Sequence, residues 1–126
     1  MHERVKALAK TVLENATETA SAKIATLNGP FLADVVKGVA FELKSAKENV
    51  VFIAATNNNG KTTLNVMISE ALISDALNAS KIVREAAKLI QGGGGGQPGF
   101  AQAGGKNADG LSAALDKMKE IVLANL

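Results

Sequence analysis

The segment VVFIAATNNNGKTTLNVMI runs from Val50 to Ile68 and contains two strand-like stretches. Val50 to Thr56 is apolar and rich in β-branched residues without helical spacing, which is typical of a buried strand. In Thr63 to Ile68 mostly polar side chains alternate with apolar ones, which predicts a second strand. The residues between them, Asn57-Asn58-Asn59-Gly60, tolerate positive φ angles, so the segment is predicted to be a β-hairpin.

Upstream of the hairpin, apolar residues recur with helical spacing in two places. Pro30 suits the first turn of the second of these helices, which continues to about Ala46. Lys23 to Leu27 predicts a short strand before the turn at Asn28-Gly29-Pro30. The first stripe consists of Val5, Leu8, Ala9, Val12, Leu13 and Ala16, and the second of Leu32, Val35, Val36, Val39, Ala40 and Leu43.

Downstream of the hairpin the pattern predicts two further helices. Asn78 is a suitable N-cap for a helix from about Ala79 to Gln91, and Gly92 is expected to end it. The last helix begins at about Ala108. Helices that flank a small sheet containing one β-hairpin indicate an α+β (mixed α/β) fold, with a glycine-rich loop between the last two helices.

Length and composition fit one globular domain and exclude several kinds of function. The chain has 126 residues, and its 47% apolar and 21% charged side chains are typical of a folded domain. It contains no Cys, which excludes thiolate metal sites, disulfides and Cys nucleophiles. Its one His is His2, at the start of the chain. No signal peptide is visible after Met1, and the uncharged run from Leu89 to Gly105 is too rich in glycine to cross a membrane. We therefore predict a cytoplasmic protein without a metal ion or other cofactor.

Residues Ala55 to Thr62, ATNNNGKT, differ from the nucleotide-binding pattern G-x-x-x-x-G-K-[ST] only in the first glycine. In such a loop Lys61 would contact phosphate and Thr62 would bind magnesium. The loop also requires a helix directly after it, so that the helix N-terminus faces the phosphates. Because Thr62 to Ile68 alternates like a strand, we favour the hairpin over a nucleoside triphosphatase site.

The segment QGGGGGQPGFAQAGGK, from Gln91 to Lys106, is the most unusual part of the sequence. Five adjacent glycines lose much backbone entropy when they become ordered, so a flexible linker is one interpretation. Three features favour an ordered loop: its place between two amphipathic helices, the second glycine pair Gly104-Gly105, and the presence of Pro98 and Phe100 as rigid turn and buried anchor. An ordered glycine loop presents backbone N–H groups in a concave nest that suits phosphate oxygens.

Positively charged side chains lie close to this segment in the sequence. Lys81, Arg84 and Lys88 are three or four residues apart, which places them on one stripe of the helix before the glycines, and Lys106 follows the second glycine pair. A solvated helix face that includes Glu85 is the alternative interpretation. The net charge is only +2, so binding of a polyanion depends on such a local patch.

The glycine motif resembles that of a known family. GGGGGQP (residues 92–98) followed by AQAGGK (residues 101–106) closely resembles the C-terminal domain of alanyl-tRNA synthetases, a DHH-associated domain also found in RecJ-type exonucleases and oligoribonucleases. Residues 78–88 and the closing helix are similar as well, and the resemblance covers about residues 30–122. Gln97 stands where many synthetases have a basic residue. The usual His of the DHH phosphoesterase motif is missing, which favours the synthetase branch.

This resemblance implies a non-catalytic domain that binds the outer corner of tRNA, helps to join aminoacylation with editing, and can support dimerisation through its helical part. By the same resemblance, residues 1–22 are the end of a connecting helical subdomain, residues 23–126 are the DHH-associated domain, and the chain is a fragment of an alanine–tRNA ligase. The residues expected to contact sugar and phosphate are Lys81, Arg84, Lys88, Gly92, Gly93, Gly94, Gly95, Gly96, Gln97, Gln102, Gly104, Gly105 and Lys106.

Two other functions stay open. The apolar stripe of the N-terminal helix would suit a short coiled coil and hence a homodimer, and packing inside the domain is its alternative explanation. The chain would also suit the substrate-binding half of a DHH phosphoesterase whose metal-binding acids lie on another domain. Catalysis by this chain itself is not expected, because Asp75, Glu85 and Asp109 are scattered singly and have no His partner.

Overall fold

The predicted hairpin is the centre of the fold. In the computed structural model, which describes residues 2–46 and 48–126, β3 (Val50–Asn58) pairs antiparallel with β4 (Lys61–Ile68). The turn between them is Asn59 at φ 53° and Gly60 at φ 82°, and two successive positive φ angles are typical of a type I′ turn. The sequence-based prediction of a buried strand, a tight turn and a second strand is confirmed.

The hairpin is extended on both sides into a six-stranded sheet with the order β1-β2-β3-β4-β6-β5. On one side β2 (Lys23–Gly29) runs parallel to β3, and the short β1 (Thr17–Glu18) pairs antiparallel with β2. On the other side β6 (Phe100–Gly105) pairs antiparallel with β4, and β5 (Gly93–Gln97) forms the outer edge.

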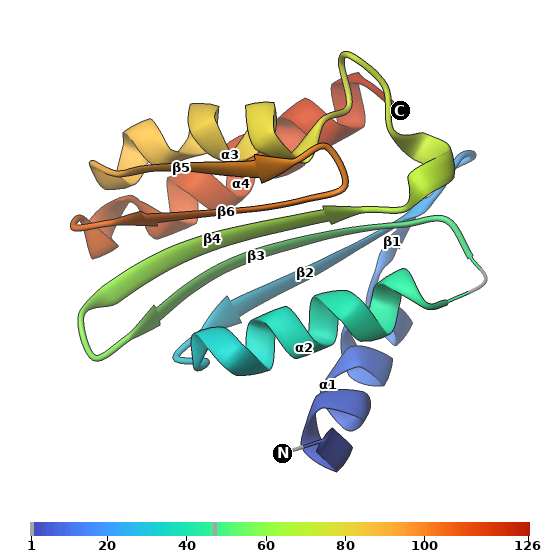
Figure 1. Ribbon diagram of the computed structural model, residues 1–126, viewed down its shortest axis with the longest axis horizontal. Helices are drawn as coiled ribbons and strands as arrows, with labels where there is room; N and C mark the ends of the chain where they lie inside the picture. Colours follow the sequence, from blue (N-terminus) through green and yellow to red (C-terminus); the bar gives the residue numbers. More distant parts are fainter. Residues whose placement is uncertain (1, 47) are drawn as a thin grey trace.

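Helices cover both faces of the sheet, as Figure 1 shows. α1 (His2–Glu14) and α2 (Ala33–Lys44), the crossover between β2 and β3, lie on one face. α3 (Ala79–Ala87), its 3₁₀ extension η2 (Lys88–Ile90) and α4 (Leu111–Ala124) lie on the other. Single 3₁₀ turns, η1 (Glu70–Leu72) and η3 (Ala108–Gly110), occur in the connections. Side chains of β3 alternate between the two cores, and the predicted α+β class is confirmed.

The apolar stripe of α1 packs inside the domain. Val5, Ala9 and Val12 are buried in the same core as α2 and β2, and Leu8 and Leu13 are partly buried against it. A helix that buries one stripe against a neighbouring helix and a sheet gains its stability from that packing. Most of the stripe that would serve a coiled coil is therefore already covered.

The start of α2 differs from the prediction. The helix begins at Ala33, so Pro30 lies before the helix and not in its first turn. Leu32 is the N-cap residue, with φ −66° and ψ 144°, and it is 56% exposed instead of facing the core. Gly29 ends β2 at φ 125°. Residues 30–32 then cross from the sheet to the helical layer, so the helix begins later than predicted.

The end of the α3–η2 helix also differs from the prediction. Gln91, and not Gly92, takes the left-handed conformation there, with φ 52° and ψ 48°. The N–H of Gly92 then donates to the carbonyl oxygen of Ala87 at 3.0 Å, which is the six-to-one bond of a Schellman motif. The predicted N-cap is confirmed, because Asn78 Oδ1 accepts from the N–H of Lys81 at 3.3 Å.

The glycine-rich segment is a β-hairpin and not the predicted loop. Gly93 to Gln97 forms β5 and pairs with β6 in a regular antiparallel register that opposes Gly93 to Gly104 and Gln97 to Phe100. An extended ladder is not a concave nest of N–H groups, so this part of the prediction is wrong. A run of glycines carries no strand propensity of its own, and the pairing with β6 therefore decides its conformation.

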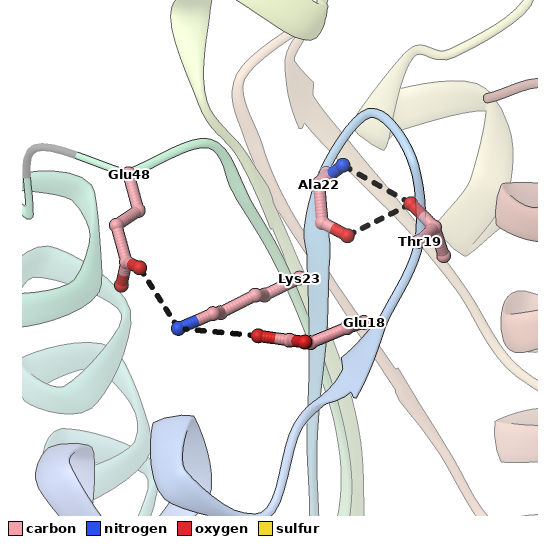
Figure 2. A network of polar contacts seen from close by, with 5 residues as sticks. All are labelled: Glu18, Thr19, Ala22, Lys23 and Glu48. Atoms are coloured by element: carbon pink, nitrogen blue, oxygen red, sulfur yellow. Dashed lines mark hydrogen bonds and ion pairs between the residues drawn. The ribbon is translucent and has the colours of Figure 1, made fainter.

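The opposite edge of the sheet is held by a polar network around Lys23 (Figure 2). Lys23 Nζ lies 2.8 Å from Glu48 Oε1 and 3.8 Å from Glu18 Oε1. Thr19 Oγ1 accepts from the N–H of Ala22 at 3.0 Å and donates to its carbonyl oxygen at 2.8 Å. The hydrogen bond to Glu48 raises the pKa of Lys23, against a smaller opposing effect of desolvation and with further help from the charges of Glu48 and Glu18. The network ties β1 to the segment before β3.

Within the described part of the chain, none of the helices has the length and apolar character that crossing a bilayer requires.

Candidate nucleic-acid interface

Alternate glycines allow β5 to approach β6 closely. A Cβ added at Gly92 would collide with the carbonyl oxygen of Gly104, and one at Gly94 would collide with the carbonyl oxygen of Gln102 and with Ala103. At Gly96 it would lie 2.7 Å from the carbonyl oxygen of Phe100 and 2.9 Å from the Cα of Ala101. Backbone this close excludes any side chain, so the chain requires glycine at these three positions.

Two more glycines join the hairpin to the end of the α3–η2 helix. Gly105 lies against the carbonyl oxygen of Ile90 and Gly110 against that of Leu89, and neither position has space for a Cβ. The N–H groups of Lys106 and Asn107 both donate to the carbonyl oxygen of Ile90, at 2.9 and 3.0 Å. The last residues of the helix and the residues after β6 are therefore held together, and Lys106 lies next to the helix end.

The three predicted cations of α3 and η2 are all exposed. Lys81 donates from Nζ to the carbonyl oxygen of Asp75 at 3.0 Å, and Lys88 Nζ lies 3.5 Å from Glu85 Oε2. Arg84 lies along β5. An exposed ion pair such as that of Lys88 with Glu85 is weak, so Lys88 can exchange its partner for an oxygen of an incoming anion.

Arg84 connects the cationic stripe to the glycine strand. A Cβ added at Gly95 would lie 3.4 Å from Arg84 Nη2 and 3.4 Å from Ser80 Oγ. Ser80 is 7% exposed, and its Oγ has no hydrogen-bond partner among the described residues. Figure 1 shows the strand running beside the helix, and the guanidinium therefore lies directly against the glycines of the edge strand.

The remaining predicted residues lie on the hairpin itself. Gln97, at the end of β5, is exposed, and Gln102 and Gly104 are exposed on β6. Gln102 donates from Nε2 to Asn65 Oδ1 at 2.8 Å. Asn65 is 0% exposed, and its Nδ2 has no partner among the described residues. The structure thus brings the glycines and Arg84 together at the β5 edge, with Lys81 and Lys88 along the same helix, whereas Gln102 lies on the other face of the sheet.

A groove that the sequence did not reveal lies on the face of the sheet opposite α3. It has a volume of about 300 Å³ and is lined by Ala33, Thr63, Gly93, Gln102, Ala103 and Gly104. A neighbouring hollow of about 260 Å³ shares Ala33 and Thr63 with it and adds Phe31, Leu32 and Lys61. The sequence signal for this hollow was the apolar pair Phe31-Leu32 directly after Gly29-Pro30. Taken alone, that pair is indistinguishable from the start of a buried helix face.

The nucleotide-loop lookalike is a hairpin, as predicted. Thr62 is buried in β4 at 1% exposure and donates from Oγ1 to the carbonyl oxygen of Gly105, so its hydroxyl is already engaged inside the sheet. No helix follows Lys61 and Thr62, because both belong to β4. Among the described residues there is also no group of three or more His, Cys, Asp or Glu side chains placed to hold a metal ion.

Comparison with protein families matches the DHHA1 domain over residues 21–124. The chain belongs to the DHHA1 domain family. Among curated relatives of this DHHA1 domain, the alanine–tRNA ligase of Bacteroides thetaiotaomicron is 48% identical over 122 residues. That match covers 96% of this chain and 14% of the ligase, so the chain spans about one seventh of the length of this relative.

Solved structures confirm the fold of this DHHA1 domain. The C-Ala domain of the Aquifex aeolicus alanyl-tRNA synthetase has a TM-score of 0.70 and 27% sequence identity, over 84% of this chain and 96% of that domain. The resemblance to the C-terminal domain of alanyl-tRNA synthetases is therefore confirmed. RecJ from Thermus thermophilus, solved with Mg²⁺, matches 98% of this chain and 18% of its own with a TM-score of 0.58. Its identity of 21% shows a shared fold alone.

Proposed function

We propose that this DHHA1 domain binds the outer corner of alanine tRNA as the C-terminal domain of an alanine–tRNA ligase. The observation that carries the proposal is the position of Arg84 against the glycine edge strand at Gly95. Lys81 and Lys88 extend this positive charge along α3 and η2, and Lys106 adds to it at the helix end. The names of the relatives support tRNA as the polyanion.

The expected contacts are to the sugar–phosphate backbone. An edge strand leaves alternate N–H groups unpaired, and without side chains these groups are accessible to phosphate oxygens. Lysine and arginine contacts position nucleic acid without reading its sequence, and structured RNA is recognised largely by shape. In the full-length ligase such binding would hold the tRNA while its acceptor end moves between the aminoacylation and editing sites.

A charge-removal experiment tests this proposal. The triple variant Lys81→Ala, Arg84→Ala, Lys88→Ala is compared with Arg4→Ala, Lys6→Ala, Lys10→Ala, which removes one Arg and two Lys from the exposed face of α1. Fluorescence anisotropy with an alanine tRNA transcript is measured across salt concentrations. The α3 variant should bind more weakly, with a log–log salt slope reduced by about 1 per lost phosphate contact. An unchanged affinity and slope would reject this surface.

The link between aminoacylation and editing requires the whole ligase. The α3 triple variant placed in a full-length relative should slow both aminoacylation and hydrolysis of mischarged tRNA, because both reactions use the same bound tRNA. If the variant keeps both activities at the wild-type rate, this surface has no role in linking the two reactions.

Dimerisation through α1 is a second proposal with less surface to support it. Leu8 and Leu13 remain partly accessible, whereas Val5, Ala9 and Val12 are used inside the domain. Light scattering of the chain over a range of concentrations tests it, and a monomer throughout would reject it. The role of a phosphoesterase substrate domain rests on the fold shared with RecJ, whereas the high-coverage relatives bear the name of the ligase.

A further inference from the structure

Two glycines of the hairpin are not required by the fold. A Cβ added at Gly93 would meet no atom within 4 Å, and one at Gly104 would meet only the carbonyl oxygen of Thr62, at 3.7 Å. Neither residue has a positive φ. This contrasts with Gly92, Gly94 and Gly96, where a Cβ would collide with β6. Because glycine weakens a strand, its presence at two unconstrained positions needs another explanation, and close approach of a ligand to the backbone is one.

The two unconstrained glycines form one bare patch. Gly93 opposes Gly104 in the β5–β6 register, and Gly104 opposes Thr63 in the β4–β6 register. The three residues are therefore neighbours across the sheet, and all three line the groove of about 300 Å³. Ala33, at the start of α2, lines the same groove. At Gly93 and Gly104 the lining of the groove is therefore backbone without a side chain.

A buried polar group without a partner lies beside this floor. The next row of the sheet pairs Asn65 with Gln102, on the same face as Thr63 and Gly104 because the rows are two residues apart. Gln102 lines the groove and bonds to Asn65, whose Nδ2 has no partner among the described residues although the residue is 0% exposed. A buried donor without an acceptor is unfavourable, and rearrangement of the Gln102 amide around a ligand would give this pair new partners.

We propose that this groove receives the flat face of an unstacked RNA nucleobase, a contact that rests on the tRNA-binding function proposed above. A planar base can lie at van der Waals distance from peptide planes only where no Cβ intervenes, which Gly93 and Gly104 provide. Gln102 is placed to hydrogen-bond the edge of the base, as side-chain amides do. The neighbouring hollow contributes Phe31 and the exposed Leu32 as apolar surface. Lys61 supplies a cation for the adjoining phosphate, and Asp34 puts one carboxylate in the same lining. Unstacked bases are the elements of RNA that proteins read directly.

The decisive experiment adds a positive charge inside the groove. Gly93→Lys places a long charged side chain at a residue that lines the groove, and Thr26→Lys adds the same charge at an exposed position of β2, outside the groove and the predicted contacts. We expect Gly93→Lys to weaken binding of an alanine tRNA transcript about tenfold, in the range of one lost stacking contact, while Thr26→Lys binds at least as tightly as the wild type. Equal or tighter binding by Gly93→Lys would overturn the inference, because an extra cation strengthens binding in a groove that receives phosphate.

A second pair of measurements separates base from phosphate and guards against misfolding. Gly104→Leu blocks the same groove from β6, and circular dichroism checks that each variant is folded. Inorganic polyphosphate, which has no bases, should bind the wild type and Gly104→Leu equally well. Gly104→Leu should bind tRNA more weakly than the wild type does. A parallel loss of both ligands would overturn the nucleobase assignment. Absence of tRNA binding by the wild type would instead reject the proposed function itself.

Discussion

Gln102 Nε2 donates to Asn65 Oδ1 at 2.8 Å, and this bond leaves the Nδ2 of a fully buried asparagine without a partner among the described residues. The two residues face each other across β4 and β6, 37 positions apart in the chain. One of them is buried and the other is exposed at the groove. A polar pair of this kind is more costly to the free domain than an apolar one of similar size, which suggests that it serves binding.

Replacing Asn65 by Leu should therefore separate stability from binding. Asn65→Leu removes the unpaired donor, and Gln102 regains water because it is exposed, so we expect the free energy of unfolding to rise by about 1 kcal/mol. Binding of tRNA should weaken in the same variant. Urea denaturation and anisotropy titration measure the two effects, and Thr26→Val, at an exposed position of β2 away from the groove, serves as the control that should change neither. A destabilised variant that binds normally would contradict this assignment.

The alternating roles of the glycines predict opposite effects for neighbouring substitutions. Gly94→Ala places a Cβ against the backbone of Gln102 and Ala103 and should lower the free energy of unfolding by about 2 kcal/mol or more. Gly93→Ala places it in open space and should raise that free energy by about 0.5 kcal/mol, because alanine is less flexible in the unfolded chain. Thermal and urea unfolding compare the two. Similar losses at both positions would show that the hairpin is held differently.

The ion pair of Lys23 predicts a change of stability at alkaline pH. The pKa of Lys23 is raised above its ordinary value of 10.5 in the folded state, first by its hydrogen bond to Glu48. A raised pKa means that the stabilisation is complete below pH 10.5 and is lost as the pH rises through the folded-state pKa. The difference in free energy of unfolding between the wild type and Lys23→Met should therefore shrink from about pH 9 to about pH 12, as Lys23 loses its proton.

Urea unfolding at several pH values measures this difference. Lys117→Met serves as the control for the loss of one positive charge, because Lys117 Nζ lies 4.0 Å from Glu120 in an exposed pair on α4. A difference for Lys23→Met that stays constant across this pH range would mean that the Glu48 contact does not contribute to folding.

The left-handed residue at the end of the α3–η2 helix predicts a stabilising substitution. Gln91 adopts φ 52° and ψ 48°, which costs a residue with a side chain more than it costs glycine. Gln91→Gly should raise the free energy of unfolding by about 0.5 kcal/mol. Gly92→Ala is the matched opposite, because its Cβ would collide with the carbonyl oxygen of Gly104. Differential scanning calorimetry should show the melting temperature rising in the first variant and falling in the second.

Local sequence patterns determined the elements of this fold whose partners are close in the chain. Alternation in β4, the apolar run of β3 and the Asn59-Gly60 turn identified the central hairpin, because side-chain period and turn geometry are properties of neighbouring residues. Helical spacing identified the buried faces, and the glycine motif identified the family. The cations of α3 could be placed on one stripe for the same reason.

Only the tertiary structure decided what the glycine run becomes. Its strand conformation depends on the pairing and close backbone approach of β5 and β6, and these contacts have no signature in the local spacing of glycines. The groove likewise arises where Ala33 of α2 meets Gly104 of β6, residues far apart in the chain and brought together by the order of the strands. Periodicity shows which side of an element is buried, but packing between distant elements determines which backbone is left bare.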